Sequence, residues 1–413
     1  MRRRSARSLE LPRRRTVSRI PAASRPSGAG GDARDRRRSN VTAVQPLQLL
    51  SPEGGASVEP PEGLDPERLL SLYRNMVRLR VFDRRALNLQ RQGRINFYAP
   101  ASGQEAAMIG SAAALEPQDV AYPTYRESGV CLQRGMSLRT MADQLFGNAR
   151  DLVKGRQMPN HWSSREHNIV SISSCIATQI PQAAGTGMAQ RFRGENAATI
   201  CYFGDGATSE GDFHAGLNFA GVFRANTVFF CQNNQWAITV PVTRQTAAPS
   251  IAIKASAYGF EGIRIDGNDL LVVYKTVREA LEKARSGGGP TLIEALTYRM
   301  GPHSTSDDPR RYRTEQEVET WRRRDPIERL QRYLEARGWI DAEQVERIAA
   351  EAKEEVDRAI SEAEAVGPPE PETLFEDVYA RPTPQLERER RELLDLIRRG
   401  VVSRVTHTPI RGS

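Results

Sequence analysis

The chain has 413 residues, 39% of them hydrophobic, and a net charge of +8. This length and composition allow a sizeable buried core, and no apolar run is long enough to span a membrane. Four cysteines without paired spacing exclude a disulfide framework and a cysteine zinc site, and indicate reduced thiols: Cys131, Cys175, Cys201 and Cys231.

The positive charge is concentrated at the N-terminus. Residues 1–45 hold three Arg triplets among Ser, Ala, Gly and Pro, so we expect a disordered tail. It could be a transit peptide, an arm for nucleic acid or an acidic partner, or an extension upstream of the true start. Glu10, Asp32 and Asp35 count against a transit peptide. Residues 46–64, rich in Pro and Gly, indicate a linker.

The folded part is predicted to begin at Asp65-Pro66, a helix cap followed by proline at the first helical position. Leu70, Tyr73 and Val77 then repeat at helical spacing. A polar and aromatic loop, residues 94–105, follows this helix and leads into an Ala-rich helix.

Two further polar segments carry candidate ligand-binding side chains. Residues 122–129, YPTYRESG, follow a short strand-like run and contain Tyr125 and Arg126. A phenol and a guanidinium suit diphosphate oxygens, although an ordinary surface arginine is the alternative. Residues 171–181, SISSCIATQIP, place hydroxyl and amide oxygens on an apolar segment, which could cap a helix or ligate a monovalent cation.

A strand–helix–strand pattern occupies the middle of the chain. One apolar run, residues 199–203, stops at Gly204-Asp205-Gly206, and a second, residues 227–231, stops before Asn233-Asn234. The intervening residues 211–223 have helical apolar spacing. This order is typical of a right-handed parallel crossover.

Polar side chains follow both of these strands. Ligands bind beyond the carboxyl ends of parallel strands, where Asp205 and Asn234 are predicted to lie. One carboxylate and one amide oxygen, with a backbone carbonyl nearby, suit a magnesium ion that shares a phosphate. Two glycines of the intervening helix, Gly216 and Gly221, are predicted to let its backbone pack close against a sheet.

The rest of the chain continues the same pattern. We predict a strand within residues 257–267, a helix at 269–286 and a strand at 290–300. The last strand leads to RMGPHSTSDD, which places His303 at the same edge as Asp205 and Asn234. A lone histidine is more often structural, but a near-neutral imidazole there could stabilise developing charge. Residues 326–413 are predicted to form a helical C-terminal extension, in which Asp341 with Gln344 caps a helix.

Gly204-Asp205-Gly206 and Asn233-Asn234 have 26 residues between Gly206 and Asn233. At this spacing the two motifs resemble the diphosphate-binding signature of thiamine-diphosphate enzymes. The motifs with their flanking residues, GDGATSEGDFHAGLNFA and CQNNQWAI, resemble the alpha subunits of the decarboxylating component of branched-chain 2-oxo acid dehydrogenases. This resemblance extends from about Leu69 to about Ala380. The resemblance implies an α/β fold with a parallel thiamine-diphosphate-binding sheet and helices on both faces, at 65–325. Bacterial pyruvate dehydrogenase alpha subunits are the nearest rival; GRQMP and SEGDFHAGLNF favour the branched-chain family.

The resemblance also implies roles for individual residues. The magnesium ligands are Asp205, Asn234 and the Trp236 carbonyl. The potassium ligands are Ser173, Cys175, Thr178 and Gln179. The cofactor neighbours are Tyr125, Arg126, Ser174, Ile176, Gly204, Asp205, Gly206, Ala207, Asn234 and His303. The catalytic residues are His303 and Arg299, and the substrate neighbours are Phe97, Tyr98 and Gln104. The chain departs from mitochondrial members at Cys175, where they carry proline, and at Gln232, where they carry arginine.

The function implied by the resemblance is oxidative decarboxylation of 3-methyl-2-oxobutanoate with thiamine diphosphate, Mg²⁺ and K⁺, followed by acylation of a lipoyl group on a transacylase core. The glutamate that activates the cofactor lies on a beta subunit in this family, so we expect an α2β2 heterotetramer. A non-catalytic scaffold or nucleic-acid binder is the alternative of another class; basic residues outside the tail do not cluster with aromatics, so we expect no nucleic-acid partner. The expected location is cytoplasmic, or the mitochondrial matrix if the tail is a transit peptide.

Overall fold

The computed structural model describes residues 45–55 and 57–402. Residues 1–44 of the predicted Arg-rich tail, and residues 403–413 of the predicted helical extension, lie outside the described residues. None of the described helices is both long and apolar enough to cross a membrane.

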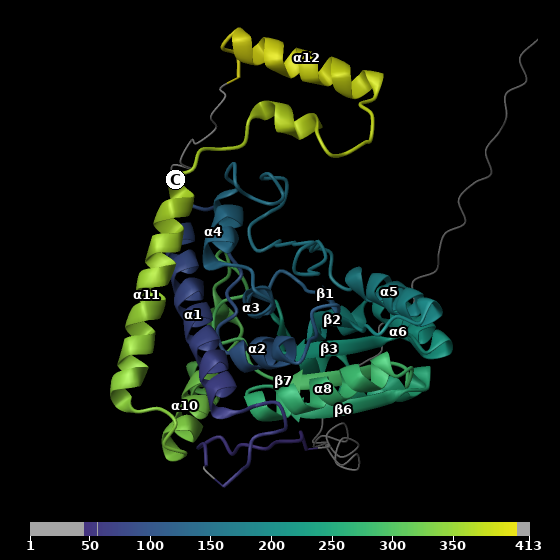
Figure 1. Cartoon of the computed structure of the whole chain (residues 1–413), viewed down its shortest axis with the longest axis vertical. Coiled ribbons are helices and arrows are strands. Elements are labelled where there is room, and N and C mark those ends of the chain that lie inside the picture. The colour runs from purple at the N-terminus through teal and green to yellow at the C-terminus, as the bar shows by residue number, and fades with distance from the viewer. Residues whose placement is uncertain (1–44, 56, 403–413) are drawn as a thin grey trace, which may run out of the picture. The chain divides into compact units, whose positions relative to one another are not determined.

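A five-stranded sheet, with every pair of neighbours parallel, forms the centre of the fold in the order β1-β2-β3-β7-β6 (Figure 1). The strands are β1 (Val120–Tyr122), β2 (Thr199–Gly204), β3 (Thr227–Asn233), β6 (Glu261–Asp266) and β7 (Thr291–Leu296). The predicted strands at 199–203 and 227–231 are confirmed. The predicted strand within 257–267 is shorter, because residues 252–258 form the 3₁₀ turn η2. All five carboxyl ends therefore lie at one edge.

The side chains of β2 alternate between two hydrophobic cores. Ile200 and Tyr202 belong to the core that α1 (Pro66–Arg91), α2 (Glu105–Ala113) and α8 (Leu270–Arg285) share. Cys201 and Phe203 belong to the core under α5 (Gln179–Arg193) and α6 (Gly211–Phe223). Because successive strand residues point to opposite faces, helices cover both faces of the sheet.

The remaining elements are short or lie in the C-terminal region. They are α3 (Ser128–Gln133), α4 (Leu138–Phe146), η1 (Asp205–Ser209), β4 (Trp236–Ala237), β5 (Val240–Pro241), α7 (Val242–Gln245), η2 (Ala252–Tyr258), η3 (Pro309–Arg311), α9 (Glu315–Arg322), α10 (Pro326–Ala336), α11 (Ala342–Glu364), η4 (Pro371–Phe375) and α12 (Pro384–Arg398).

The helix caps are where the sequence predicted them. The Asp65 carboxylate accepts from Arg68 N at 2.7 Å at the start of α1. Asp341 and Gln344 form a reciprocal capping box at the start of α11. Helix α11 then packs against α1 (Figure 1), and its Val356 is fully buried in their shared core. Within residues 326–402, α10, α11 and α12 are helical.

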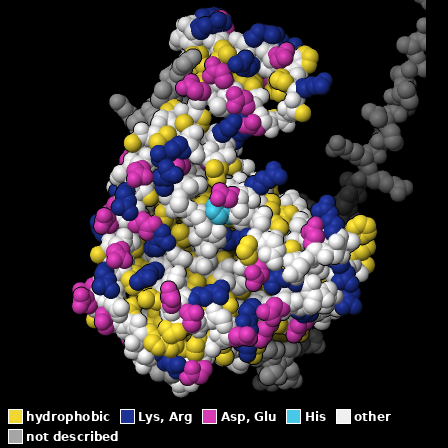
Figure 2. Space-filling view, viewed as in Figure 1, with side chains coloured by type: hydrophobic (Ala, Val, Ile, Leu, Met, Phe, Trp, Pro, Cys, Tyr) yellow, Lys and Arg dark blue, Asp and Glu magenta, His cyan; other side chains and the backbone are white. Residues whose placement is uncertain are grey.

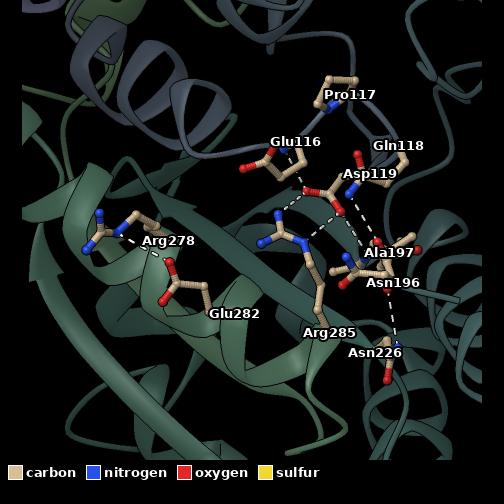
Figure 3. Close-up of polar contacts among 12 residues, drawn as sticks. Glu116, Pro117, Gln118, Asp119, Asn196, Ala197, Asn226, Arg278, Glu282 and Arg285 are labelled. Carbon is tan, nitrogen blue, oxygen red and sulfur yellow. Dashed lines mark hydrogen bonds and ion pairs between the residues drawn. The ribbon is translucent and has the colours of Figure 1, made fainter. Parts of the chain in front are cut away.

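A buried carboxylate joins elements at the amino-terminal end of the sheet (Figure 3). Asp119, fully buried, directly precedes β1 and accepts from Ala198 N and Glu116 N, both at 2.8 Å. Arg285, in the last turn of α8, forms a two-pronged ion pair with the same carboxylate. Asp119 therefore holds β1, the residue before β2, and α8 together.

The backbone of α6 packs closely against a neighbouring segment at both Gly216 and Gly221, as predicted, but neither segment is a strand of the sheet. A Cβ at Gly216 would lie 2.8 Å from Ile180 Cγ2 and 2.9 Å from Pro181 N, both in α5. A Cβ at Gly221 would overlap the carbonyl oxygen of Tyr258 in η2. The prediction of close backbone packing is right and the predicted partner is wrong, because Phe213, Leu217 and Ala220 take the face of α6 toward the core.

Gly221→Ala is expected to destabilise the protein by about 2 kcal/mol, because the backbone of η2 must move to admit the methyl group. The matched control is Gly185→Ala in α5, where a Cβ has no neighbour within 4 Å. That change is expected to be neutral or to stabilise by up to about 1 kcal/mol, because alanine favours helix. Thermal unfolding of both variants measures the difference, and equal stabilities would contradict the expectation.

Candidate active site

A pocket opens where β1, β2, β3 and β7 end. It encloses about 660 Å³ of empty space, part of it open to solvent. Most of the predicted cofactor, magnesium and catalytic residues line it together: Tyr125, Arg126, Ile176, Gly204, Asp205, Gly206, Ala207, Asn234, Trp236, Arg299 and His303. Because neighbouring strands are parallel, residues far apart in sequence meet at this one edge, as expected for a ligand site of an open parallel sheet.

Asp205 is the buried carboxylate of the pocket. It begins η1 directly after β2 and is 2% exposed. Burial raises its pKa to about 6, while hydrogen bonds from Gln245 and from the Asn234 backbone oppose the shift. Gln245 Nε2, in α7, donates to Asp205 Oδ2 at 2.6 Å. Desolvation without a full set of partners makes this carboxylate a strong candidate cation ligand.

The two asparagines after β3 have different environments. Asn233 Nδ2 donates to the buried Glu294 at 2.8 Å, and its Oδ1 accepts from the Gln235 side chain at 2.9 Å. Asn233 therefore fixes the turn. Asn234 lines the pocket, where its Nδ2 donates to Gln104 Oε1 at 3.2 Å and its Oδ1 accepts from Trp236 N at 3.3 Å. Only the second asparagine can present its amide oxygen to a ligand.

Arg299 is fully buried beside the loop between β3 and α7. Its Nη1 donates to the Trp236 carbonyl at 3.0 Å, and its Nη2 donates to the Ile238 carbonyl at 2.8 Å. Ile238 has a φ of 53°, which is strained for a β-branched residue. The Trp236 carbonyl retains one lone pair for a metal ion. Arg299 thus holds the loop that forms one wall of the pocket.

Arg126, Tyr125 and His303 meet beside Arg299 in the pocket. Arg126 Nη2 donates to the His303 carbonyl at 2.9 Å and lies 3.2 Å from His303 Nδ1. The Tyr125 ring stacks on His161, with centroids 6.3 Å apart, and lies edge-on to His303 at 6.2 Å. Burial, Arg126 and Arg299 lower the pKa of His303 to about 3. His303 is therefore neutral at physiological pH.

A family model described as "Dehydrogenase E1 component" matches residues 73–372, most of the chain. An Arabidopsis thaliana protein, 2-oxoisovalerate dehydrogenase subunit alpha 1, is 46% identical over 79% of this chain and 70% of its own length. The chain belongs to this family, as a 2-oxoisovalerate dehydrogenase alpha subunit. The Homo sapiens alpha subunit is 43% identical over 86% of this chain and 80% of its own length. The Dictyostelium discoideum alpha subunit is 44% identical over 80% of this chain and 75% of its own length.

Sequence reasoning missed two contacts in this E1 chain. Glu127, buried beside Arg126, accepts from Thr124 N at 2.5 Å and from Gln232 Nε2 at 2.6 Å. Burial raises the pKa of Glu127. The departure at Gln232 was visible in the sequence, but its partner was not. The contact of Gln245 with Asp205 had no sequence signal either, because Gln245 lies 40 positions away in the short helix α7.

The predicted potassium segment of the E1 chain is held by hydrogen bonds of its own side chains. Thr178 Oγ1 donates to the Cys175 carbonyl at 2.8 Å, and Ser173 Oγ accepts from Cys175 N at 3.2 Å. Gln179 Nε2 donates to the Tyr202 carbonyl at 2.8 Å. Next to them, Ser174 Oγ lies 2.6 Å from His161 Nε2. The potassium assignment stays a prediction.

The three predicted substrate neighbours are placed differently. Gln104 lines the pocket, fully buried at the start of α2. Tyr98 is fully buried and Phe97 half-buried, and neither lines the pocket. The Tyr98 carbonyl accepts from Thr305 N at 3.1 Å and so supports the segment that follows His303.

The polar atoms around the pocket fit a diphosphate with its cation. Among the buried side-chain atoms of the described residues that have no hydrogen-bond partner, four belong to residues that line the pocket or contact Asp205 in it: Gln104 Nε2, Gln232 Oε1, Gln245 Oε1 and Arg299 Nε. Unpaired buried polar atoms are costly, so they indicate a polar occupant. The two nitrogens are donors that suit phosphate oxygens, and the two oxygens suit metal-bound water. With Asp205 and Asn234 they make up a set of polar groups that would suit a hard cation and a phosphate.

Proposed function

We propose that this alpha chain acts with a beta subunit in the thiamine-diphosphate-dependent oxidative decarboxylation of branched-chain 2-oxo acids, with 3-methyl-2-oxobutanoate as the principal substrate. The observation that carries the proposal is the meeting of Asp205, Asn234 and His303 in one pocket at the carboxyl edge of the sheet. The identity to alpha subunits named for 2-oxoisovalerate supports the branched-chain substrate.

In this proposal the chain holds the cofactor through its diphosphate. Asp205, Asn234 and the Trp236 carbonyl would bind Mg²⁺, which in turn would bind the diphosphate. Arg126 and Tyr125 line the same pocket and would donate to phosphate oxygens. A Cβ at Gly204 would have no neighbour closer than 4.0 Å, so the backbone there leaves room for a phosphate.

The bound cofactor supplies the carbon nucleophile that attacks the 2-oxo carbonyl and allows carbon dioxide to leave. The protein supplies position and electrostatics. Arg299 holds the Trp236–Ile238 wall, Gln245 orients the Asp205 carboxylate, and Ile176 and Ile238 place apolar surface at the pocket. His303 would stabilise the oxygen of the acyl group as it passes to a lipoyl group on a transacylase core.

A beta partner follows from membership among alpha subunits, and we propose an α2β2 assembly in which the beta subunit provides the glutamate that activates the cofactor. The face shown in Figure 2 intermingles Lys and Arg with Asp and Glu, which argues against nucleic-acid binding by this face. The named relatives are mitochondrial proteins. A cytoplasmic location, or the matrix if residues 1–44 act as a transit peptide, stays a prediction.

The test is decarboxylation by the chain purified with its beta subunit, with an artificial electron acceptor. We expect 3-methyl-2-oxobutanoate to be turned over with at least tenfold higher kcat/KM than pyruvate, which corresponds to about 1.4 kcal/mol of discrimination. We expect no turnover without the beta subunit. A preference for pyruvate would move the chain to the pyruvate dehydrogenase alpha subunits and leave the cofactor site intact.

A further inference from the structure

Two guanidinium groups face one nitrogen of the His303 ring. Arg126 Nη2 lies 3.2 Å, and Arg299 Nη1 lies 3.3 Å, from His303 Nδ1. The two arginines come from different parts of the fold, since Arg126 follows β1 and Arg299 follows β7. Each is also held by backbone carbonyls: Arg126 by Pro100 and His303, Arg299 by Trp236 and Ile238. The pair is therefore fixed in place independently of the imidazole.

The chemistry of the donors decides where the ring proton lies. An arginine side chain has only N–H donors and stays charged in proteins. Nδ1 can satisfy both contacts only as an acceptor, so it carries no proton. A neutral imidazole then carries its single proton on Nε2. Nε2 has no hydrogen-bond partner among the described residues, and His303 lines the pocket.

We propose that Arg126 and Arg299 are positioning residues that lock His303 in the Nε2–H tautomer, so that His303 acts on the bound ligand as a hydrogen-bond donor and does not take a proton from it. The inference deepens the proposed function and rests on it, because it assigns the ligand in the pocket to the cofactor and its acyl group. For Nε2 to accept a proton, its existing proton must first move to Nδ1, where it would face two cations.

The other groups around the ring agree with this assignment. The Asp307 carboxylate is the acidic group near the ring, and its Oδ2 accepts from the His303 backbone N at 2.7 Å and from Tyr312 Oη at 2.6 Å. It thus binds the backbone of His303 and not the ring. The Tyr125 ring lies edge-on to the imidazole. Burial and the two arginines lower the pKa of His303 to about 3, against the opposing effect of Asp307. The lowered pKa therefore favours the neutral ring at neutral pH.

The direct test reads the proton position in the assembled alpha–beta component. Histidine labelled with ¹⁵N in the ring is incorporated, and the magic-angle-spinning NMR spectrum of the His303→Gln variant is subtracted from that of the native protein. The expected difference signal is a neutral imidazole with the proton on Nε2 and no titration between pH 6 and pH 9. A proton on Nδ1, or an imidazolium at pH 7, would overturn the proposal.

A second measurement uses substitutions that mimic each ring nitrogen. The amide N–H of glutamine lies near the position of Nε2, whereas that of asparagine lies near the position of Nδ1. We expect His303→Gln to retain about tenfold more lipoyl-acylation activity than His303→Asn, with both variants assembling with the beta subunit. Equal loss in both variants would contradict a donor role.

Arg126→Lys tests the positioning role of Arg126, with the NMR signal read without cofactor because Arg126 is also proposed to bind the diphosphate. One ammonium cannot replace the guanidinium at both the ring and the carbonyl of His303. We expect the His303 signal to become a mixture of tautomers or to titrate within pH 6 to pH 9. An unchanged signal would show that Arg126 does not set the tautomer. The NMR measurement needs no substrate, so a preference for pyruvate would overturn the proposed substrate and leave this result unaffected.

Discussion

Asp205→Asn is expected to abolish the stabilisation that thiamine diphosphate and Mg²⁺ give to the alpha–beta component and to lower kcat by at least 10³-fold. The physical reason is that asparagine supplies no negative charge to a divalent cation in a buried site. The measurement is the shift of the unfolding temperature with saturating cofactor and Mg²⁺, followed by turnover. A cofactor-dependent shift equal to that of the native protein would contradict the assignment of Asp205 as the metal ligand.

The same substitution is expected to stabilise the protein without cofactor. The pKa of Asp205 is raised from 3.8 to about 6 by burial, so the folded state binds its proton more tightly than the unfolded state does. Stability then falls as the pH rises from about 4 to about 6, and the cost remains above pH 6, on the order of 3 kcal/mol. Asparagine removes this cost. At pH 8 without cofactor the variant should unfold at a higher temperature than the native protein, and at pH 4 the difference should vanish.

A matched control separates the effect of the Asp205 carboxylate from that of the hydrogen bond it accepts from Gln245. Gln245→Ala leaves the Asp205 carboxylate in place but removes the hydrogen bond from Nε2 at 2.6 Å. We expect this variant to keep a cofactor-dependent shift, with the affinity for Mg²⁺ reduced about tenfold, as is usual when a hydrogen-bond partner of a metal ligand is lost. Loss of all binding in Gln245→Ala would show that Gln245 itself is a ligand.

Asp119→Ala is expected to destabilise the protein by about 4 kcal/mol without changing the chemistry of the active site. The substitution leaves the Arg285 guanidinium without its buried counter-charge and removes the acceptor for Ala198 N and Glu116 N. Breaking a buried ion pair by removing one partner is costly, because the other charge stays buried. Asp119 lies at the amino-terminal end of the sheet, while the pocket lies at the carboxyl end. Urea unfolding, with kcat measured below the transition, tests both parts.

An exposed ion pair provides the comparison. Lys353 Nζ and Asp357 Oδ2 lie 2.9 Å apart on α11, and the Lys353 side chain is 75% exposed. Lys353→Ala should change stability by less than about 0.5 kcal/mol, because solvent screens the pair. If Asp119→Ala costs no more than Lys353→Ala, the buried pair does not hold β1, β2 and α8 together.

Local patterns in the sequence predicted the main elements of the fold. The apolar runs of β2 and β3, the spacing of α6 and the caps at Asp65 and Asp341 depend on residues that are close in sequence. The edge shared by Asp205 and Asn234 follows from these elements, because a right-handed crossover brings both carboxyl ends to one side. The sequence therefore predicted that Asp205 and Asn234 would meet in one pocket.

Only the tertiary structure decided how those residues are supported. Glu127 and Gln232 are 105 positions apart, Arg126 and His303 are 177 apart, and they meet because β1 and β7 flank β2 and β3. That strand order depends on the packing of both faces and has no local signal. The same holds for Gly221, whose need for glycine was visible in the sequence but whose neighbour, the Tyr258 carbonyl, was not. The sequence determined the chemical groups, because each is set by residue type and nearby pattern. The tertiary structure decided their tautomers and partners, because these depend on contacts between distant segments.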